Sequence, residues 1–230
     1  MKRPALKLKL IQHLYQKEVR INRASDMDDS GYTLIELLVV IIIIGVLAAA
    51  SAPSWLTFVN QRRVSSANEI ILRALQEAQS QAKNKKVSYS VSVKNENGVP
   101  SVAVYQAKKS DGTNFPPYNW KSLNQELTLR PGQILLGTNL SGENQVGSLS
   151  YNLSNANNYT ITFDYLGALA GDVRLDANNP LTIAVAVPKN NNSTDPNESI
   201  MRCVKVTTLL GAIKTGRGKS DCLPTSSAGS

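Results

Sequence analysis

The sequence predicts an α+β protein in which one long N-terminal α-helix packs on an antiparallel β domain. Three observations support this prediction. An uncharged, mostly apolar run begins at Leu37 and continues to Gln61. An amphipathic helical pattern follows it, and after Lys86 the apolar period changes to two residues. The 230 residues of the chain are enough for one membrane element and one modest domain.

The first thirty residues are charged and mixed, with no apolar core of their own. A secretory signal peptide places its apolar stretch directly after the basic start, and its small-residue cleavage site after that stretch. Here the order differs, because the small residue Gly31 comes before the apolar run. Met27 is an alternative start codon to Met1 and would leave a short leader.

The apolar run is long enough to cross a bilayer, since about 20 mostly apolar residues suffice. We expect Pro53 to kink this helix rather than end it, because neighbouring groups can satisfy the one backbone bond that proline removes. Beyond it, six small or aliphatic residues recur at spacings of three and four and form one stripe: Val64, Ala67, Ile71, Leu75, Ala78 and Ala82. The pattern predicts one helix from about Thr33 to Asn84, whose second half lies in the globular domain.

The remainder of the chain reads as strands. Residues 87–94 alternate between apolar and polar side chains, and Asn97-Gly98 is a favoured hairpin dipeptide before a second strand at 99–105. Residues 106–122 are expected to be a loop. Further strands are expected at 127–129, 133–136, 159–164, 181–187 and 203–209, separated by Asn-, Ser- and Gly-rich connections.

Composition argues against an enzyme. His13 is the only histidine and lies in the N-terminal segment. If that segment is removed, no histidine remains for Ser-His-Asp or Cys-His catalysis or for the common zinc sites. We therefore expect no catalytic residues, no metal site and no cofactor. The net charge of +8 is a mild excess that suits anionic partners but also an ordinary solvated surface.

The order of parts at the N-terminus carries a family resemblance. Gly31, Tyr32 and the following TLIELLVV resemble the class III signal of type IV pilins and type II secretion pseudopilins, and Pro53 falls where many pilins carry a kinking proline. The resemblance implies that a prepilin peptidase cuts between Gly31 and Tyr32 and methylates the new amine of Tyr32. Two features depart from the family: the first mature residue is usually Phe, and the leader is longer than is typical.

Glu36 is an acid near the start of the apolar run. A bare carboxylate in hydrocarbon costs several kcal/mol unless it is paired. In a filament of staggered helices, the N-terminal amine of a neighbouring subunit can pair with it, and a wrong register leaves it unpaired. The resemblance therefore implies that Glu36 sets the assembly register. The alternative is an ordinary single-pass anchor whose glutamate reaches the membrane interface.

A second resemblance covers most of the mature chain. The segments LRALQEAQSQAKNKKVSYSV, YTITFDYLGALAG and CVKVTTLLGAIKTGRGKSDC are similar to those of the GspH/FimT group of minor pilins and pseudopilins. We accordingly expect a removed leader at 1–31, a transmembrane and assembly helix at 32–61, and the amphipathic second half of the helix at 62–86. A globular β domain with a C-terminal disulfide loop would follow at 87–230.

The C-terminal tail combines two cysteines with a cluster of basic residues. Cys203 and Cys222 can pair if the domain is exported, and would stay thiols in a reducing cytosol; we expect a structural disulfide. Between them, Lys214, Arg217 and Lys219 lie in a Gly-rich segment that lets cations approach phosphates. Some FimT-like proteins bind DNA through such a tail, so the resemblance implies a DNA site at these three residues. The alternative is a solvated basic loop held by the disulfide.

The expected protein is thus a non-enzymatic minor pilin that serves type IV pilus assembly, with a contribution to DNA uptake. It would sit in the bacterial inner membrane with a single span and a periplasmic C-terminal domain, and then enter a pilus or pseudopilus. Its partners would be other pilins, the prepilin peptidase, the inner-membrane assembly platform and DNA, with no small-molecule substrate. Two alternatives stay open: a type II secretion pseudopilin acting in protein export, and a nucleic-acid-binding module displayed on a pilus.

Overall fold

The computed structural model describes residues 31–108, 112–153, 159–173, 175, 178–190 and 193–223. Residues 1–30 of the expected leader lie outside these residues, as do His13 and Met27. The chain divides into two compact units between Ala52 and Pro53.

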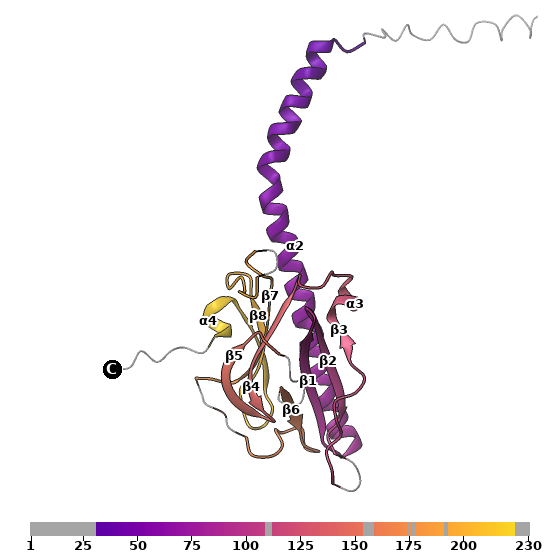
Figure 1. Ribbon diagram of the computed structural model, residues 1–230, viewed down its shortest axis with the longest axis vertical. Helices are drawn as coiled ribbons and strands as arrows, with labels where there is room; N and C mark the ends of the chain where they lie inside the picture. Colours follow the sequence, from indigo (N-terminus) through magenta and orange to yellow (C-terminus); the bar gives the residue numbers. More distant parts are fainter. Residues whose placement is uncertain are drawn as a thin grey trace, which may run out of the picture. The chain divides into compact units, whose positions relative to one another are not determined.

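The predicted long helix is confirmed as α2, Leu34–Lys85 (Figure 1). Thr33 caps its start, because the Thr33 hydroxyl accepts a hydrogen bond from the backbone N–H of Glu36 at 3.2 Å. The helix ends where Lys86 takes a left-handed conformation with φ 58°, a common way to close a helix. Local capping therefore sets both ends within one residue of the prediction.

Among the described residues, no single helix meets the length and hydropathy of a membrane span. The pieces Leu34–Ala50 and Ser54–Lys85 meet these criteria only when they are taken together as a bent pair. The side chain of Pro53 is outside the described side chains. The kink expected at Pro53 therefore stays a prediction.

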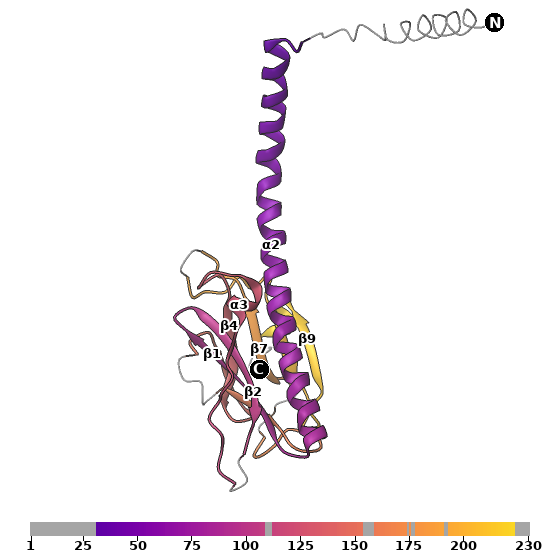
Figure 2. The ribbon, with the colours of Figure 1, turned by 90° about the vertical axis from the view of Figure 1, so that its right-hand side faces the viewer.

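In the second unit, α2 packs on two antiparallel sheets, with the strand orders β3-β2-β1-β6 and β5-β4-β7-β8-β9 (Figures 1 and 2). The first sheet consists of β1 (Tyr89–Glu96), β2 (Val99–Gln106), β3 (Lys121–Ser122) and β6 (Thr160–Phe163). The second consists of β4 (Leu135–Gly142), β5 (Gln145–Ser150), β7 (Leu181–Ala186), β8 (Arg202–Val206) and β9 (Ile213–Arg217). The predicted α+β class with antiparallel pairing is confirmed.

The hydrophobic core lies between α2 and the two sheets. The six residues of the predicted stripe are all fully buried there: Val64, Ala67, Ile71, Leu75, Ala78 and Ala82. They share one cluster with side chains of both sheets, such as Val91 of β1 and Ile183 of β7. Because three of the six stripe residues are alanines, the helix backbone can approach the sheets closely.

The β1–β2 hairpin turns where the sequence predicted it. Asn97 and Gly98 both have positive φ, 52° and 74°, as a two-residue hairpin turn requires. The register places Glu96 opposite Val99 and Val91 opposite Val104. The turn therefore fixes which side chains of β1 face the core.

Several local predictions are wrong. Residues 127–129 do not form a strand. The short helix α3, Leu123–Leu127, ends there, and the Ser122 hydroxyl caps its start by accepting from the Gln125 N–H. The expected loop at 106–122 ends in strand β3. The apolar pattern did not predict strands β5 and β9, because glycine and polar residues leave little apolar alternation in either; for β9, the GspH/FimT resemblance alone implied a glycine-rich basic strand. A second short helix, α4, covers Gly218–Cys222.

Candidate processing and assembly site

The peptide bond expected to be cut joins Gly31 to Tyr32, just before the cap of α2. Both residues are exposed and lie outside helix and strand, and the Tyr32 side chain is 78% exposed. A Cβ built on Gly31 would meet no heavy atom within 4 Å. Packing within the described chain therefore does not require glycine at this position. A peptidase that selects a small residue before its cut would require a residue such as glycine here.

Glu36 lies in the first turn of α2, the third residue of the helix. Thr33 and Glu36 have the T-x-x-E spacing of a capping box, which was not among the features predicted from the sequence. A carboxylate in this position also interacts favourably with the positive end of the helix dipole. Glu36 therefore has a local role within its own helix in addition to the pairing expected from the resemblance.

Among the described residues of the first unit, the large apolar side chains from Tyr32 to Leu47 are exposed. From Tyr32 to Leu47, the large apolar residues are between 43% and 82% exposed. An apolar surface of this extent is unfavourable in water and marks a site of contact with lipid or with other proteins. The helix thus presents Glu36 at the start of a surface that other helices or lipid must cover.

The predicted disulfide is formed between Cys203 on β8 and Cys222 on α4. Both cysteines are buried, and their Cα atoms are 5.6 Å apart. Gly216 lies opposite Cys203 in the β8–β9 pair, and a Cβ there would come 2.8 Å from the Cys203 sulfur. The disulfide therefore links the C-terminal tail to the outer face of the second sheet. The absence of a side chain at Gly216 leaves space for the Cys203 sulfur.

The three basic residues of the tail do not share one face. Lys214 and Arg217 are three residues apart on β9, so their side chains leave opposite faces of this edge strand. Lys219 on α4 forms an ion pair with Glu198 at 2.9 Å. Lys214 instead faces Lys205 across the β8–β9 pair. The three residues therefore do not form one cluster: Lys214 and Arg217 lie on opposite faces of β9, and Lys219 is paired with Glu198.

Tyr151 packs against the buried cluster that contains Cys203 and Cys222, a contact that the sequence did not predict. Its ring fills the space over Gly137, where a Cβ would come 2.7 Å from the ring. Burial raises the pKa of the Tyr151 hydroxyl to about 12, and the negative charge of Glu198 adds to the effect. The neutral hydroxyl is therefore the form that this packing favours.

Comparisons with known proteins agree with the N-terminal site. The family model of the prokaryotic N-terminal methylation motif matches residues 26–52. No curated protein matches the chain.

Two solved structures are similar at low identity. One is the type IV minor pilin FimU of Pseudomonas aeruginosa strain PAO1, with 15% identity and a TM-score of 0.43, over 72% of this chain and 98% of that one. The other is the minor pseudopilin EPSH from the type II secretion system of Vibrio cholerae, with 15% identity and a TM-score of 0.41, over 71% of this chain and 99% of that one.

The matched motif contains the bond after Gly31, the cap of α2 and Glu36. These features stand in the order that the resemblance requires: small residue, aromatic residue, acid and apolar helix. The chain thus carries the prokaryotic N-terminal methylation motif, with its small residue, aromatic residue and acid at Gly31, Tyr32 and Glu36.

Proposed function

We propose that the chain is a minor pilin of a type IV pilus, made as a precursor and cut between Gly31 and Tyr32. The observation that supports this most is the methylation motif placed on an exposed, non-helical bond directly before a capped apolar helix. A peptidase needs such an accessible, extended bond. Once the leader is gone, Tyr32 carries the free amine that becomes methylated.

After processing, residues 32–61 hold the subunit in the bacterial inner membrane and later in the filament. Residues 62–86 continue the helix into the β domain at 87–230, which lies in the periplasm. The exposed apolar side chains from Tyr32 to Leu47 suit both environments, because lipid and neighbouring helices are equally apolar. The partners are the prepilin peptidase, the inner-membrane assembly platform and other pilins.

Glu36 directs the assembly step. When the helix leaves lipid for the filament, the carboxylate needs a cationic partner, and the amine of a neighbouring subunit supplies one. A subunit shifted along the filament would leave the charge unpaired, so pairing selects the correct register. The hydrogen bond that the structure shows at the cap uses the Glu36 backbone N–H, whereas a capping box also uses the carboxylate, so the two roles need separate tests.

One pair of substitutions separates the two roles of Glu36. Glutamine can take the place of glutamate in a capping box but carries no charge. We expect Glu36→Gln and Glu36→Ala to be processed and membrane-bound, yet absent from sheared pili on an immunoblot. Glu69→Gln, at an exposed glutamate later in α2, is the matched control and should enter pili. Entry of Glu36→Gln at the wild-type level would show that capping, not charge pairing, is its function.

Processing is tested by intact mass and N-terminal sequencing of the protein recovered from membranes. We expect a mature chain that begins with N-methylated Tyr32. A chain that keeps residues before Tyr32 would contradict the proposal. The rival pseudopilin function is tested by deleting the gene: loss of piliation with normal protein export supports a pilin, and the reverse result supports a pseudopilin.

We further propose that the basic tail contributes to DNA uptake through Lys214, Arg217 and Lys219. All three residues are exposed. Lys214 and Arg217 lie on β9 at the edge of the second sheet, where a duplex can approach. Contacts of this kind go to phosphates and are independent of base sequence. A gel shift with variants of the three residues tests this contact.

A further inference from the structure

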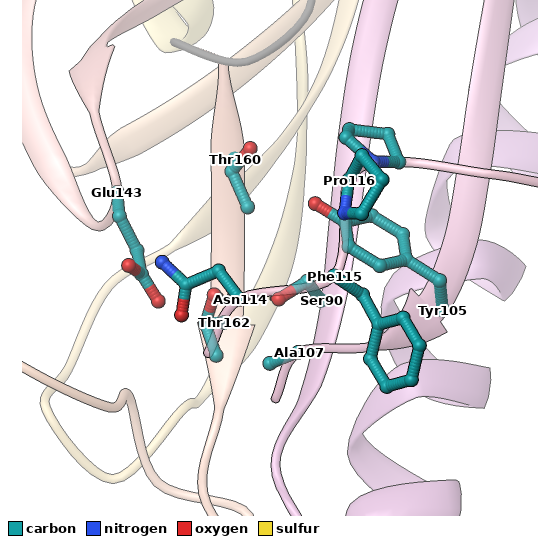
Figure 3. Close-up of a pocket in the computed structure, with 10 residues that line it drawn as sticks. Ser90, Tyr105, Ala107, Asn114, Phe115, Pro116, Glu143, Thr160 and Thr162 are labelled. Atoms are coloured by element: carbon teal, nitrogen blue, oxygen red, sulfur yellow. Dashed lines mark hydrogen bonds between the residues drawn. The ribbon is translucent and has the colours of Figure 1, made fainter. Parts of the chain in front are cut away.

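A pocket of about 290 Å³ opens on the first sheet, away from the helix (Figure 3). It is built by three separate parts of the chain: strands β1, β2 and β6, the segment that follows β2, and the tip of the β4–β5 hairpin. Its lining residues are Ser90, Tyr105, Ala107, Asn114, Phe115, Pro116, Pro117, Glu143, Thr160 and Thr162. The assembly helix contributes no residue to it.

The floor of the pocket is a layer of buried hydroxyl groups. Ser90 contacts Thr162 at 2.8 Å between hydroxyl oxygens. Ser92 contacts Tyr105 at 2.9 Å and Thr160 at 2.6 Å in the same way. These five hydroxyl groups have five O–H hydrogens and share three hydrogen bonds. Each bond uses one hydrogen, so two O–H hydrogens have no acceptor among the five hydroxyl groups. The floor therefore has a surplus of donors.

The mouth of the pocket carries an acceptor. Glu143 is exposed, and among the described residues its carboxylate forms no ion pair. The next residue, Asn144, is fully buried and holds the hairpin tip in place. The Asn144 side chain donates to the carbonyl of Thr162 at 2.9 Å and accepts from the Thr162 N–H at 2.9 Å. The Glu143 backbone is therefore fixed beside the hydroxyl floor, and Figure 3 shows Asn114 between them.

Apolar groups form the remaining wall. Pro116, Pro117 and the Phe115 ring line it. Phe115 and Tyr118 are in edge contact with ring centroids 5.9 Å apart, and Tyr118 also lies 5.7 Å from the ring of Tyr105. These ring contacts hold the wall against the sheet. Among the described residues, the pocket thus combines surplus hydroxyl donors, a carboxylate without an ion pair and an apolar surface.

We propose that this pocket binds a neutral saccharide, such as the terminal sugar of a glycan. A sugar ring has hydroxyl oxygens for the donors of the floor, hydroxyl hydrogens for Glu143, and a C–H face for the proline and aromatic wall. A phosphate or nucleic acid would be repelled by Glu143. A purely apolar ligand would leave the hydroxyl donors and the carboxylate buried and unsatisfied. A cationic ligand would pair with Glu143 but would leave the donors of the floor unused.

The test uses the full mature chain in a polyoxyethylene detergent, because common detergents carry sugar headgroups. Saturation-transfer NMR is recorded with glucose, galactose, mannose, N-acetylglucosamine and N-acetylgalactosamine, and with putrescine as a cationic probe. We expect saturation transfer to at least one sugar and none to putrescine. The dissociation constant of that sugar should rise about tenfold or more in Glu143→Gln and in Ser90→Ala, because each removes a hydrogen-bonding group.

Glu126→Gln is the matched control, since Glu126 is an exposed glutamate that does not line the pocket. Its sugar affinity should equal that of the wild type, and circular dichroism should show that all variants are folded. The proposal is overturned if none of the sugars receives saturation, if putrescine alone does, or if Glu143→Gln and Ser90→Ala both keep the wild-type affinity. These readouts do not depend on pilus assembly.

Discussion

The side-chain amide of Gln79 on α2 donates a hydrogen bond to the backbone carbonyl of Gly211 at 3.0 Å. The same nitrogen donates to the carbonyl of Gly167 at 2.7 Å. Gly167 belongs to the loop after β6 and Gly211 to the loop between β8 and β9. One helix residue therefore joins the two sheets at their loops, in addition to the apolar contacts of the core.

Replacing Gln79 with alanine should lower the free energy of unfolding by about 2 kcal/mol, because two carbonyls lose a half-buried donor. Urea unfolding of the full chain in detergent measures this. Gln76→Ala, at an exposed glutamine on the same helix, is the control and should change stability by less than about 0.5 kcal/mol. Equal effects of the two substitutions would show that the Gln79 bonds do not stabilise the domain.

This pair of glutamines also shows how far the sequence alone can predict the structure. The apolar stripe of α2 was predictable because its period is a property of the helix itself. Gln76 and Gln79 both lie off that stripe and look alike in the sequence. Only the tertiary fold brings Gly167 and Gly211 to one of them.

The same distinction holds for the candidate sites. The methylation motif around Gly31 and Glu36 was predictable because all of its parts are contiguous in the chain; the cut itself stays a prediction. The pocket was not predictable, because Ser90, Glu143 and Thr162 come from distant segments with no motif. The division of the basic tail was missed for a different reason: β9 has no alternation that would have identified it as a strand.

Two buried asparagines should respond differently to substitution. Asn139 on β4 donates to Asn179 and Pro180 and accepts from the Thr182 N–H. Asn124 on α3 is also buried, but among the described residues neither polar atom of its side chain has a partner. Asn139→Ala should cost about 3 kcal/mol in urea unfolding, whereas Asn124→Ala should be neutral or stabilising. A large loss in Asn124→Ala would indicate a hydrogen bond that this structure lacks.

Stability should fall at high pH because of Tyr151. Its pKa is raised from the ordinary value of 10.0 to about 12 in the folded state. Between these values the unfolded chain loses the proton and the folded chain keeps it, so the unfolded state is favoured as pH rises. The loss should be roughly 2 kcal/mol from pH 10 to 12. Tyr151→Phe should remove this part of the pH dependence, while Tyr165→Phe, at an exposed tyrosine, should leave it unchanged.

Removing the disulfide should destabilise the β domain. The bond closes a segment with a sequence separation of 19 residues, and a loop of this size contributes about 3 kcal/mol by restricting the unfolded chain. The double variant Cys203→Ala/Cys222→Ala should lose about that amount in urea unfolding. Wild-type protein in dithiothreitol should lose a similar amount, and the double variant should not respond to the reductant. A wild-type protein insensitive to reductant would contradict the prediction.

The proposed DNA contact is tested by charge-matched variants. Lys214→Ala, Arg217→Ala and Lys219→Ala in one chain should weaken binding to a duplex in a gel shift. They should also reduce the slope of log affinity against log salt by about 2, because Lys219 is already paired with Glu198 and releases few counterions. The control triple variant changes the exposed residues Lys121, Arg130 and Lys189 to alanine and has the same net charge. Equal affinity and slope in the two triple variants would mean that DNA is attracted by the overall charge and that the tail is not its site.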